Sequence, residues 1–256
     1  MKNCPDSQDS DMPPPQSDYQ GFYDRIAHDY HRSRYGTRYG RLFRALHQGA
    51  LGELLTALPA GAFALEVACG TGHTTELLRD RRIEFIACDL TPNMLQELRE
   101  RVGIDLRLVR SDAMCLPFAD ASFDLVVSTR FMHLFEPVHQ KRLLLEMHRV
   151  LRPGGRLIVD FDHFTSRWLL AVPHLAYNLI RYRRLAPDTH YNRIAQTERL
   201  LTDCGFTQID SIGIGGYHLI VPALYSPALA LRWGIRHQHS PWRWLAEQFV
   251  CTGLRR

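Results

Sequence analysis

A turn that contains two glycines is the part of this sequence whose residue types best suit ligand binding. The stretch 66–72 reads EVACGTG, in which an apolar run ends at the glycines and a helix-like segment follows. Glycine lets the backbone approach a ligand closely and adopt conformations that other residues disfavour. The N-terminus of the following helix offers free N–H groups and a positive dipole end, which suit a carboxylate or a phosphate. Such a turn is equally compatible with a structural role. Whether it binds a ligand must therefore be judged from the residues that follow it in the sequence.

The spacing of the glycines separates two classes of cofactor. A dinucleotide site has the pattern G-x-G-x-x-G, and the third glycine position is Thr75 here, which counts against NAD and FAD. Asp89 ends the next apolar run, 17 positions after Gly72, where a carboxylate can accept both ribose hydroxyls of a nucleoside. Asp112 ends a third run and can accept a hydrogen bond from an adenine amino group. Both aspartates also have a structural alternative, in which Asp89 caps the next helix and Asp112 caps a turn.

Apolar runs alternate with helix-like segments through the middle of the chain. This alternation predicts crossover units and a parallel sheet that is covered on both faces. The expected strands are residues 62–68, 83–90, 104–112, 123–130 and 155–162. The expected helices are residues 38–58, 71–81, 91–102, 138–151 and 197–205, and further strand candidates follow at 206–214 and 217–225.

The motifs LEVACGTG, SDAMCLPFADASFDLVVS and VLRPGGRLIV, together with Asp89, occur in order along the chain. They resemble the class I S-adenosylmethionine-dependent methyltransferases, and in particular the group that contains the ubiquinone and menaquinone biosynthesis methyltransferases. The resemblance covers residues 22–162 and then a helix–strand–strand ending at about 225. It implies a Rossmann-like α/β fold with a seven-stranded, mostly parallel sheet, helices on both faces, an antiparallel last strand and helical cap insertions. It also implies S-adenosylmethionine as the cofactor.

The resemblance carries twelve cofactor-binding positions onto this chain. Glu66 would face the amino group of the methionyl part or fix the loop, and Met94 is also compatible with a core position. The assigned positions are Glu66, Ala68, Gly70 and Gly72 for the methionyl part, Asp89 for the ribose, Leu90, Met94, Asp112 and Ala113 for adenine, Thr129 and Phe131 near the sulfonium, and Tyr30 as a cover.

The reaction that the resemblance implies depends mainly on positioning, because a methyl group on a sulfonium is already activated. A general base contributes only if the acceptor carries a proton with a high pKa. His133, in FMHLF after the fourth strand, is the candidate catalytic residue, and a structural role is its alternative. His28, His31 and His163 are further candidates, and the aromatic faces of Tyr23, Tyr30 and Phe131 suit a cationic cofactor.

The expected parts of the chain are a disordered tail (1–18), a methyltransferase domain (19–225) with substrate-cap segments 19–50 and 163–195, and a Trp- and Arg-rich C-terminal extension (226–256). The tail lacks the apolar residues of a core or of a signal peptide. In the extension, Trp242, Leu245 and Phe249 fall on one helical face. The cap and the extension are compatible with plain packing, with a pocket for a small apolar acceptor, or with a peripheral membrane contact.

The composition of the chain limits the class of protein, its compartment and its partners. Hydrophobic residues make up 45% and charged residues 23% of the chain, which is typical of a globular protein. Six cysteines without C-x-x-C or zinc spacing predict a reduced, cytoplasmic protein with no metal site. A net charge of +4 gives little reason to expect nucleic acid as a partner. An RNA (tRNA) methyltransferase and a non-catalytic S-adenosylmethionine-binding protein stay as alternatives, and the sequence leaves the oligomeric state open.

Overall fold

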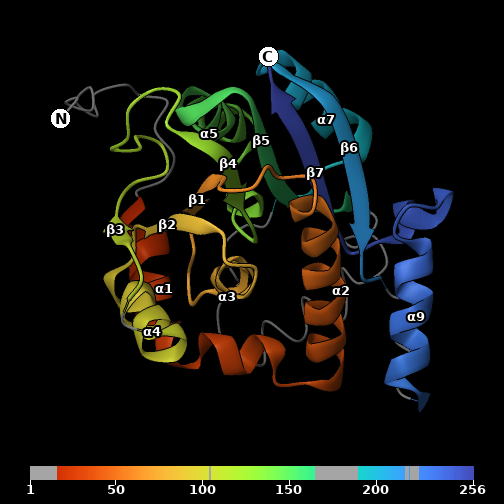
Figure 1. The fold of residues 1–256 in the computed structure, drawn as a ribbon. Helices are drawn as coiled ribbons and strands as arrows, with labels where there is room; N and C mark the ends of the chain where they lie inside the picture. The colour runs from red at the N-terminus through yellow and green to blue at the C-terminus, as the bar shows by residue number, and fades with distance from the viewer. Residues whose placement is uncertain (1–15, 104, 165–189, 217–218, 220–224) are drawn as a thin grey trace.

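A seven-stranded sheet forms the centre of the molecule (Figure 1), with the strand order β3-β2-β1-β4-β5-β7-β6. The computed structural model describes residues 16–103, 105–164, 190–216, 219 and 225–256. Every neighbouring pair from β3 to β5 is parallel, and β7 is antiparallel to both β5 and β6. This confirms the predicted Rossmann-like sheet with an antiparallel last strand. The strands are β1 (Phe63–Val67), β2 (Glu84–Asp89), β3 (Leu108–Arg110), β4 (Phe123–Ser128), β5 (Leu151–Asp162), β6 (Phe206–Ile214) and β7 (Gln248–Arg255).

Helices cover both faces of the sheet and enclose two large apolar clusters. The helices α5 and α7 pack on one face, where Leu143 and Leu201 are fully buried. The helices α2, α3 and α9 pack on the other face, around Leu46 and Leu78. The helices are α1 (Gln16–Tyr35), α2 (Arg38–Leu55), α3 (His73–Asp80), α4 (Pro92–Val102), α5 (Pro137–Val150), α7 (Ile194–Asp203) and α9 (Pro227–His237), with short 3₁₀ turns η1 (Met132–Leu134) and η3 (Pro241–Leu245).

Strand alternation decides which helix each buried polar side chain meets. In β5, Leu157 and Val159 join the cluster under α5, whereas Ile158 joins the cluster under α2. Because side chains alternate along a strand, Asp160 faces α2 as well. The same rule places Glu66 of β1 on the face that α3 covers, since Ala64 packs there and Leu65 does not.

The C-terminal part differs from the prediction. Residues 226–256 are not an extension, because Gln248–Arg255 form β7, which lies between β5 and β6. Phe249 is therefore a fully buried strand residue rather than part of a helical face with Trp242 and Leu245, which belong to η3. The strand has only a short apolar pattern, and it was not predicted because the residues before it are rich in Trp and Arg. The expected strand 217–225 lies almost wholly outside the described residues.

Other boundaries moved by a few residues. Strand β5 begins directly at Leu151, four residues before the expected start, and β3 covers only three residues of the expected 104–112. Helix α1 begins at Gln16, inside the segment expected to be a disordered tail, and residues 1–15 lie outside the described part. Much of the expected cap segment 163–195 lies outside it too. In the described part of the chain, no helix has the length and apolar character needed to cross a bilayer.

Candidate active site

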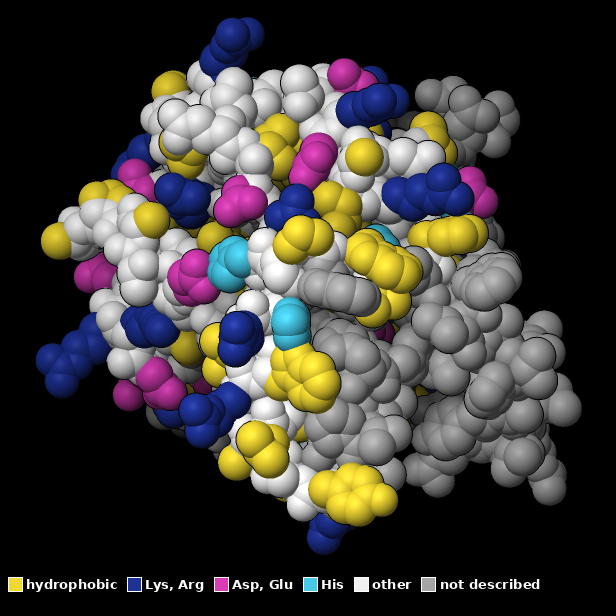
Figure 2. Space-filling model, turned by 90° about the vertical axis from the view of Figure 1, so that its right-hand side faces the viewer, with side chains coloured by type: hydrophobic (Ala, Val, Ile, Leu, Met, Phe, Trp, Pro, Cys, Tyr) yellow, Lys and Arg dark blue, Asp and Glu magenta, His cyan; other side chains and the backbone are white. Residues whose placement is uncertain are grey.

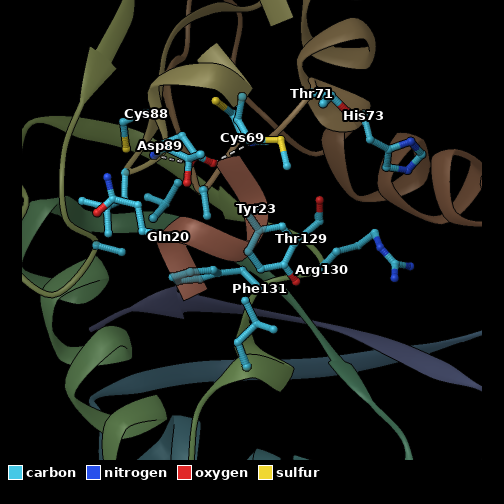
Figure 3. A pocket seen from close by; sticks show the side chains of 18 of the residues that line it. Gln20, Tyr23, Cys69, Thr71, His73, Cys88, Asp89, Thr129, Arg130 and Phe131 are labelled. Atoms are coloured by element: carbon cyan, nitrogen blue, oxygen red, sulfur yellow. Dashed lines mark hydrogen bonds between the residues drawn. The ribbon is translucent and has the colours of Figure 1, made fainter. Parts of the chain in front are cut away.

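One cavity opens at the edge of the sheet where the parallel strands β1, β2, β3 and β4 end (Figure 3). Ligands of open α/β sheets bind at this edge, because the carboxyl ends of parallel strands bring several loops together there. The empty space of this cavity, counted together with its open mouth, is about 1060 Å³. Its walls are Val67–Thr71 and His73 after β1; Cys88–Thr91 and Met94 after β2; Ser111–Ala113 after β3; Thr129–Phe131, Leu134 and Phe135 after β4; and Gln20, Tyr23, Tyr30 and Tyr35 of α1.

The two glycines of the turn, Gly70 and Gly72, have different structural roles. Gly70 lines the cavity with φ +52°, and a Cβ placed on it would meet no atom within 4 Å. The open space beside Gly70 is a cradle that a ligand can fill. Gly72 has φ +88° and does not line the cavity, and a Cβ there would collide with Cδ1 of Leu98 on α4. Gly72 therefore allows α4 to pack against the turn, and the prediction that it contacts the cofactor is not supported by its position.

Asp89 joins the turn to the next helix. Its Oδ2 accepts a hydrogen bond from the backbone N–H of Gly70 at 2.8 Å, and its Oδ1 accepts one from the backbone N–H of Thr91 at 2.9 Å. Burial raises the pKa of this carboxyl, while the two N–H groups act in the opposite direction. Each carboxylate oxygen can accept a further hydrogen bond. Asp89 thus combines a structural role, close to its predicted alternative as a helix cap, with a place in the cavity wall.

Asp112 repeats this arrangement after β3. Its Oδ1 accepts a hydrogen bond from the backbone N–H of Met114 at 2.8 Å, which holds a turn, while Asp112 and its neighbour Ala113 line the cavity. Leu90 and Met94 line the same region, as do Thr129 and Phe131 after β4. Tyr30 of α1 lines it as well. The structure therefore brings ten of the twelve predicted cofactor positions to one cavity: Tyr30, Ala68, Gly70, Asp89, Leu90, Met94, Asp112, Ala113, Thr129 and Phe131.

Glu66 is the other predicted position that does not reach the cavity. Only 2% of it is exposed, and its Oε2 accepts a hydrogen bond of 2.6 Å from the hydroxyl of Thr75. Burial raises the pKa of Glu66 to about 8, because the protein interior disfavours the charged form. The residue that departs from the dinucleotide pattern, Thr75, is thus the partner of the buried acid. Of the two predicted roles for Glu66, the geometry favours fixing the loop.

His133 also lies outside the cavity wall. It belongs to η1, is buried, and is followed by Leu134 and Phe135, which do line the cavity. Its backbone oxygen accepts a hydrogen bond from the N–H of His190 at 2.8 Å. The structure therefore does not bring the predicted catalytic histidine to the site. The other candidates His28, His31 and His163 do not line the cavity either.

A different histidine, His73, lines the cavity and belongs to a buried chain of three side chains. Nε2 of His73 lies 3.0 Å from Nδ1 of His47, and Nε2 of His47 lies 2.9 Å from Oδ2 of Asp160. Tyr35 stacks on the His73 ring, with centroids 5.0 Å apart. Burial and the neighbouring positive groups lower the pKa of His73 well below its usual range. Sequence reasoning missed His73, although its position directly after the second glycine of the turn was a usable signal.

Arg130 is a second residue of the wall that sequence reasoning did not identify. Its φ of +59° lies in the left-handed region, which is unfavourable for a residue with a side chain. The Asp160 Oδ1 atom holds this conformation by accepting a hydrogen bond of 2.6 Å from the Arg130 backbone N–H. Its guanidinium lies over the ring of Phe43, 5.6 Å from the centroid. Strained residues of this kind often occur at functional sites.

Comparisons with known proteins agree with this geometry. Residues 64–155 match the family model described as a methyltransferase domain. A demethylmenaquinone methyltransferase from Paenarthrobacter aurescens is 39% identical over 176 residues, covering 61% of this chain and 66% of that protein. A malonyl-[acyl-carrier protein] O-methyltransferase from Enterobacter lignolyticus is 32% identical over 157 residues, covering 60% of this chain and 58% of that protein.

A solved structure extends the likeness to nearly the whole fold. The crystal structure of magnesium protoporphyrin IX methyltransferase from Synechocystis PCC 6803 with bound SAH superposes with a TM-score of 0.67 at 14% identity, covering 94% of this chain and 99% of that one. Sheet order and cavity define a Rossmann-like protein with a nucleoside-type site. Residues 64–155 thus match a methyltransferase domain, and the fold is similar to that of the class I S-adenosylmethionine-dependent methyltransferases. The matches span less than two thirds of the curated relatives' length.

Proposed function

We propose that this protein transfers a methyl group from S-adenosylmethionine to a small, apolar acceptor, by O-, C- or N-methylation. The observation that carries the proposal is a single cavity in which the open side of Gly70 and the carboxylates of Asp89 and Asp112 share a wall with aromatic side chains. A site for a polar nucleoside and a site for an apolar molecule are thus continuous. Two relatives support an acceptor of this kind, since one is a demethylmenaquinone methyltransferase and the other a malonyl-[acyl-carrier protein] O-methyltransferase.

The residues of the wall suit the parts of the cofactor. Asp89 has acceptor capacity for the ribose, Asp112 for the adenine amino group, and the turn around Gly70 gives room for the methionyl part. Bound S-adenosylmethionine supplies a methyl group that is activated by its positive sulfonium. Aromatic faces stabilise a cation, and Tyr23 and Tyr30 offer them in an edge-to-face pair with centroids 5.9 Å apart.

The acceptor side of the cavity is apolar. Phe131 and Phe135 pack edge to face, with centroids 4.9 Å apart, and Leu134 lies between them in sequence. These side chains follow β4, next to Thr129, whose hydroxyl shares a hydrogen bond of 2.8 Å with Thr74. Apolar walls with a few fixed polar groups are typical of sites for small organic ligands. We therefore expect the acceptor to present a hydrophobic body to this side of the cavity.

Two measurements test the proposed function. Calorimetry should show that the purified protein binds S-adenosylmethionine and S-adenosylhomocysteine, with no comparable binding of NAD. Transfer of a labelled methyl group should then be measured to a short-chain demethylmenaquinol, to a malonyl thioester and to total tRNA. Transfer to tRNA alone would replace the small acceptor with RNA, and cofactor binding without transfer to any extract of small molecules would indicate a non-catalytic protein. Preference for NAD would overturn the proposal.

We further propose that α9 makes a peripheral contact with an anionic membrane surface, from which an apolar acceptor can be taken. Leu229, Trp233 and Ile235 are exposed by 61%, 49% and 52%, while Ala230 is buried toward α2. Figure 2 shows the side of the molecule that carries α9, with apolar and basic side chains next to each other. No Asp or Glu occurs between Asp210 and Glu247 in the sequence. Exposed Trp and Leu beside arginines are typical of helices that lie in a lipid interface.

A further inference from the structure

The loop after β4, residues 129–135, carries the apolar acceptor side of the cavity. Its residues that line the cavity are Thr129, Arg130, Phe131, Leu134 and Phe135, and Figure 3 shows the first three together in this wall. The middle of the loop is the short 3₁₀ turn η1. The backbone hydrogen bonds of such a turn have poor geometry, so its shape depends on the side chains that support it.

Gln140 of α5 supports η1 from the protein interior. Its side chain is fully buried, and its Nε2 donates hydrogen bonds of 3.0 Å to the backbone oxygens of Met132 and Phe135. The bonds of the turn itself run from the N–H of Leu134 to the oxygen of Phe131, and from the N–H of Phe135 to the oxygen of Met132. One buried side chain therefore holds the first residue of the turn and the residue that follows it.

The partners of Gln140 determine which way its amide is turned. Backbone oxygens can only accept a hydrogen bond, so Nε2 rather than Oε1 must face Met132 and Phe135. Oε1 accepts a hydrogen bond of 2.9 Å from Nδ2 of Asn192. Oδ1 of Asn192 in turn lies 3.2 Å from Nε2 of Gln140. The two side-chain amides thus form a closed pair that has one arrangement.

Asn192 connects this amide pair to the central sheet. Its backbone N–H donates a hydrogen bond of 2.9 Å to the oxygen of Asp162, the last residue of β5. Its backbone oxygen accepts one of 3.0 Å from the N–H of Phe164, and the residue forms a parallel bridge with His163. The end of β5 therefore fixes Asn192, Asn192 orients Gln140, and Gln140 holds the turn.

The start of the loop is held separately, by Asp160. Its Oδ1 accepts a hydrogen bond of 2.6 Å from the backbone N–H of Arg130, and this bond does not involve Gln140. The neighbouring Thr129 is held by its hydrogen bond to Thr74 of α3. A change at Gln140 should therefore move η1 and its flanking residues while the start of the loop stays in place.

We infer that Gln140 is a positioning residue for the methyl acceptor, which acts through the backbone of η1 on the rings of Phe131 and Phe135. The inference rests on the proposed function, because that function assigns the apolar side of the cavity to the acceptor. The two rings pack edge to face on either side of the turn, so a shift of η1 changes the surface that they present. A fully hydrogen-bonded buried amide pair favours one arrangement of its surroundings. A wall that is already in place binds its ligand without the cost of ordering side chains.

The first test needs no acceptor. Hydrogen exchange of the backbone amides should be measured in the full chain with S-adenosylhomocysteine, where the N–H groups of Leu134 and Phe135 report on η1. In Gln140→Leu both should exchange faster by about tenfold to a hundredfold, because two buried oxygens lose their donor. Amides of β1 and β4 should keep their wild-type rates. Unchanged exchange at Leu134 and Phe135 overturns the inference, whereas failure of the wild-type protein to bind S-adenosylhomocysteine overturns the proposed function.

The second test separates positioning from general stability, with a short-chain demethylmenaquinol as the probe acceptor. In Gln140→Leu the KM for this acceptor should rise by about tenfold or more, while kcat and the affinity for S-adenosylhomocysteine stay within about threefold. The matched control is Gln238→Leu, since Gln238 is a buried glutamine outside the cavity whose Nε2 donates to the backbone oxygen of Leu46 at 3.1 Å. This control should lose stability and keep the wild-type KM. An equal rise of KM in both variants overturns the inference.

The third test uses Asn192→Ala, which leaves Gln140 in place and removes only its orienting partner. The KM should rise by about threefold to tenfold, and this variant keeps the inference testable if Gln140→Leu does not fold. Because the two residues act in one chain, the double variant should have the KM of Gln140→Leu alone. A wild-type KM in Asn192→Ala, or effects that multiply in the double variant, would contradict the proposed chain.

Discussion

The backbone N–H of Gly70 donates a hydrogen bond of 2.8 Å to the carboxylate of Asp89, across 19 residues of sequence. The bond ties the end of β2 to the turn after β1. Oδ1 of the same carboxylate binds the N–H of Thr91 at the start of α4, whose own side chain does not cap the helix. One side chain therefore sets the shape of the cavity wall and is itself part of the lining.

We expect Asp89→Ala to lower both stability and cofactor affinity. Hydrogen bonds to a charged group contribute about 1.5–3 kcal/mol each, so the loss of two should lower the free energy of unfolding by about 3–6 kcal/mol. Affinity for S-adenosylhomocysteine should fall by about tenfold to several hundredfold. Asp89→Asn, which keeps one acceptor oxygen, should lie between wild type and Asp89→Ala. Denaturation should measure the stability of these proteins, and calorimetry their affinity for S-adenosylhomocysteine. The control is Asp203→Ala, which changes an exposed aspartate. Unchanged affinity per folded molecule in Asp89→Ala would refute a role of Asp89 in binding.

The two glycines of the turn should separate binding from stability. In Gly70→Ala, the added methyl enters open space in the cavity at φ +52°. It should weaken S-adenosylhomocysteine binding by more than tenfold and cost about 1 kcal/mol of stability. In Gly72→Ala, the methyl meets the fully buried Leu98 at φ +88°, and the cost should exceed about 3 kcal/mol. Melting temperature and affinity of both variants provide the check, and identical behaviour of the two would contradict the division of roles.

Most of the fold could be predicted from local pattern. Alternating apolar and helix-like segments identify β1, β2, β4 and their helices, because crossover connections require that order. The strand β7 could not be found in this way. It follows a stretch rich in Trp and Arg, and it is antiparallel, so it does not belong to the pattern of parallel strands joined by crossover helices. Its place between β5 and β6 depends on pairing with strands distant in sequence.

Much of the site was also readable, since Gly70, Asp89 and Asp112 stand directly at strand ends. Two predicted cofactor positions, Glu66 and Gly72, do not line the cavity, and both have the same cause. Glu66 and Gly72 lie in the right motif, but their side-chain directions are set by α3 and α4, and sequence spacing does not reveal those directions. The buried chain Asp160–His47–His73 could not be predicted either, because its three residues come from three elements and meet only after packing.

Glu66 should make stability depend on pH. Its pKa in the folded protein is about 8, above its ordinary value of 4.5, so the native state keeps a proton that the unfolded chain releases. Stability should therefore be highest below pH 4.5 with respect to this group, and should fall between pH 4.5 and about 8 by at most about 1.4 kcal/mol per unit. Glu66→Gln retains an oxygen for the Thr75 hydroxyl and removes the titration. Urea denaturation of both proteins from pH 6 to pH 9 should show a smaller loss in the variant, and parallel curves would show that Glu66 does not titrate there.

The surface of α9 leads to a prediction about membranes. Leu229 and Trp233 are one helical turn apart and exposed, and Arg232 and Arg236 form a second exposed row beside them. Anionic lipid attracts each such arginine by about 1 kcal/mol, so the double change Arg232→Glu and Arg236→Glu should weaken binding to vesicles of phosphatidylserine and phosphatidylcholine by more than tenfold. Trp233→Ala should weaken it through lost apolar contact, even at high salt, where the arginine contribution is screened.

The matched control for Trp233 is Leu145→Ala, because Leu145 is an apolar residue on α5 that is exposed by 46%. It should bind vesicles like the wild-type protein, since α5 lies on the other face of the sheet. Vesicle sedimentation at low and high salt measures both contributions, and circular dichroism confirms that each variant is folded. Binding that depends on charge but not on Trp233 would reduce the contact to electrostatic attraction. Equal binding by the wild-type protein, the double arginine variant, Trp233→Ala and Leu145→Ala would show that α9 does not contact the membrane. The acceptor would then have to reach the cavity from solution.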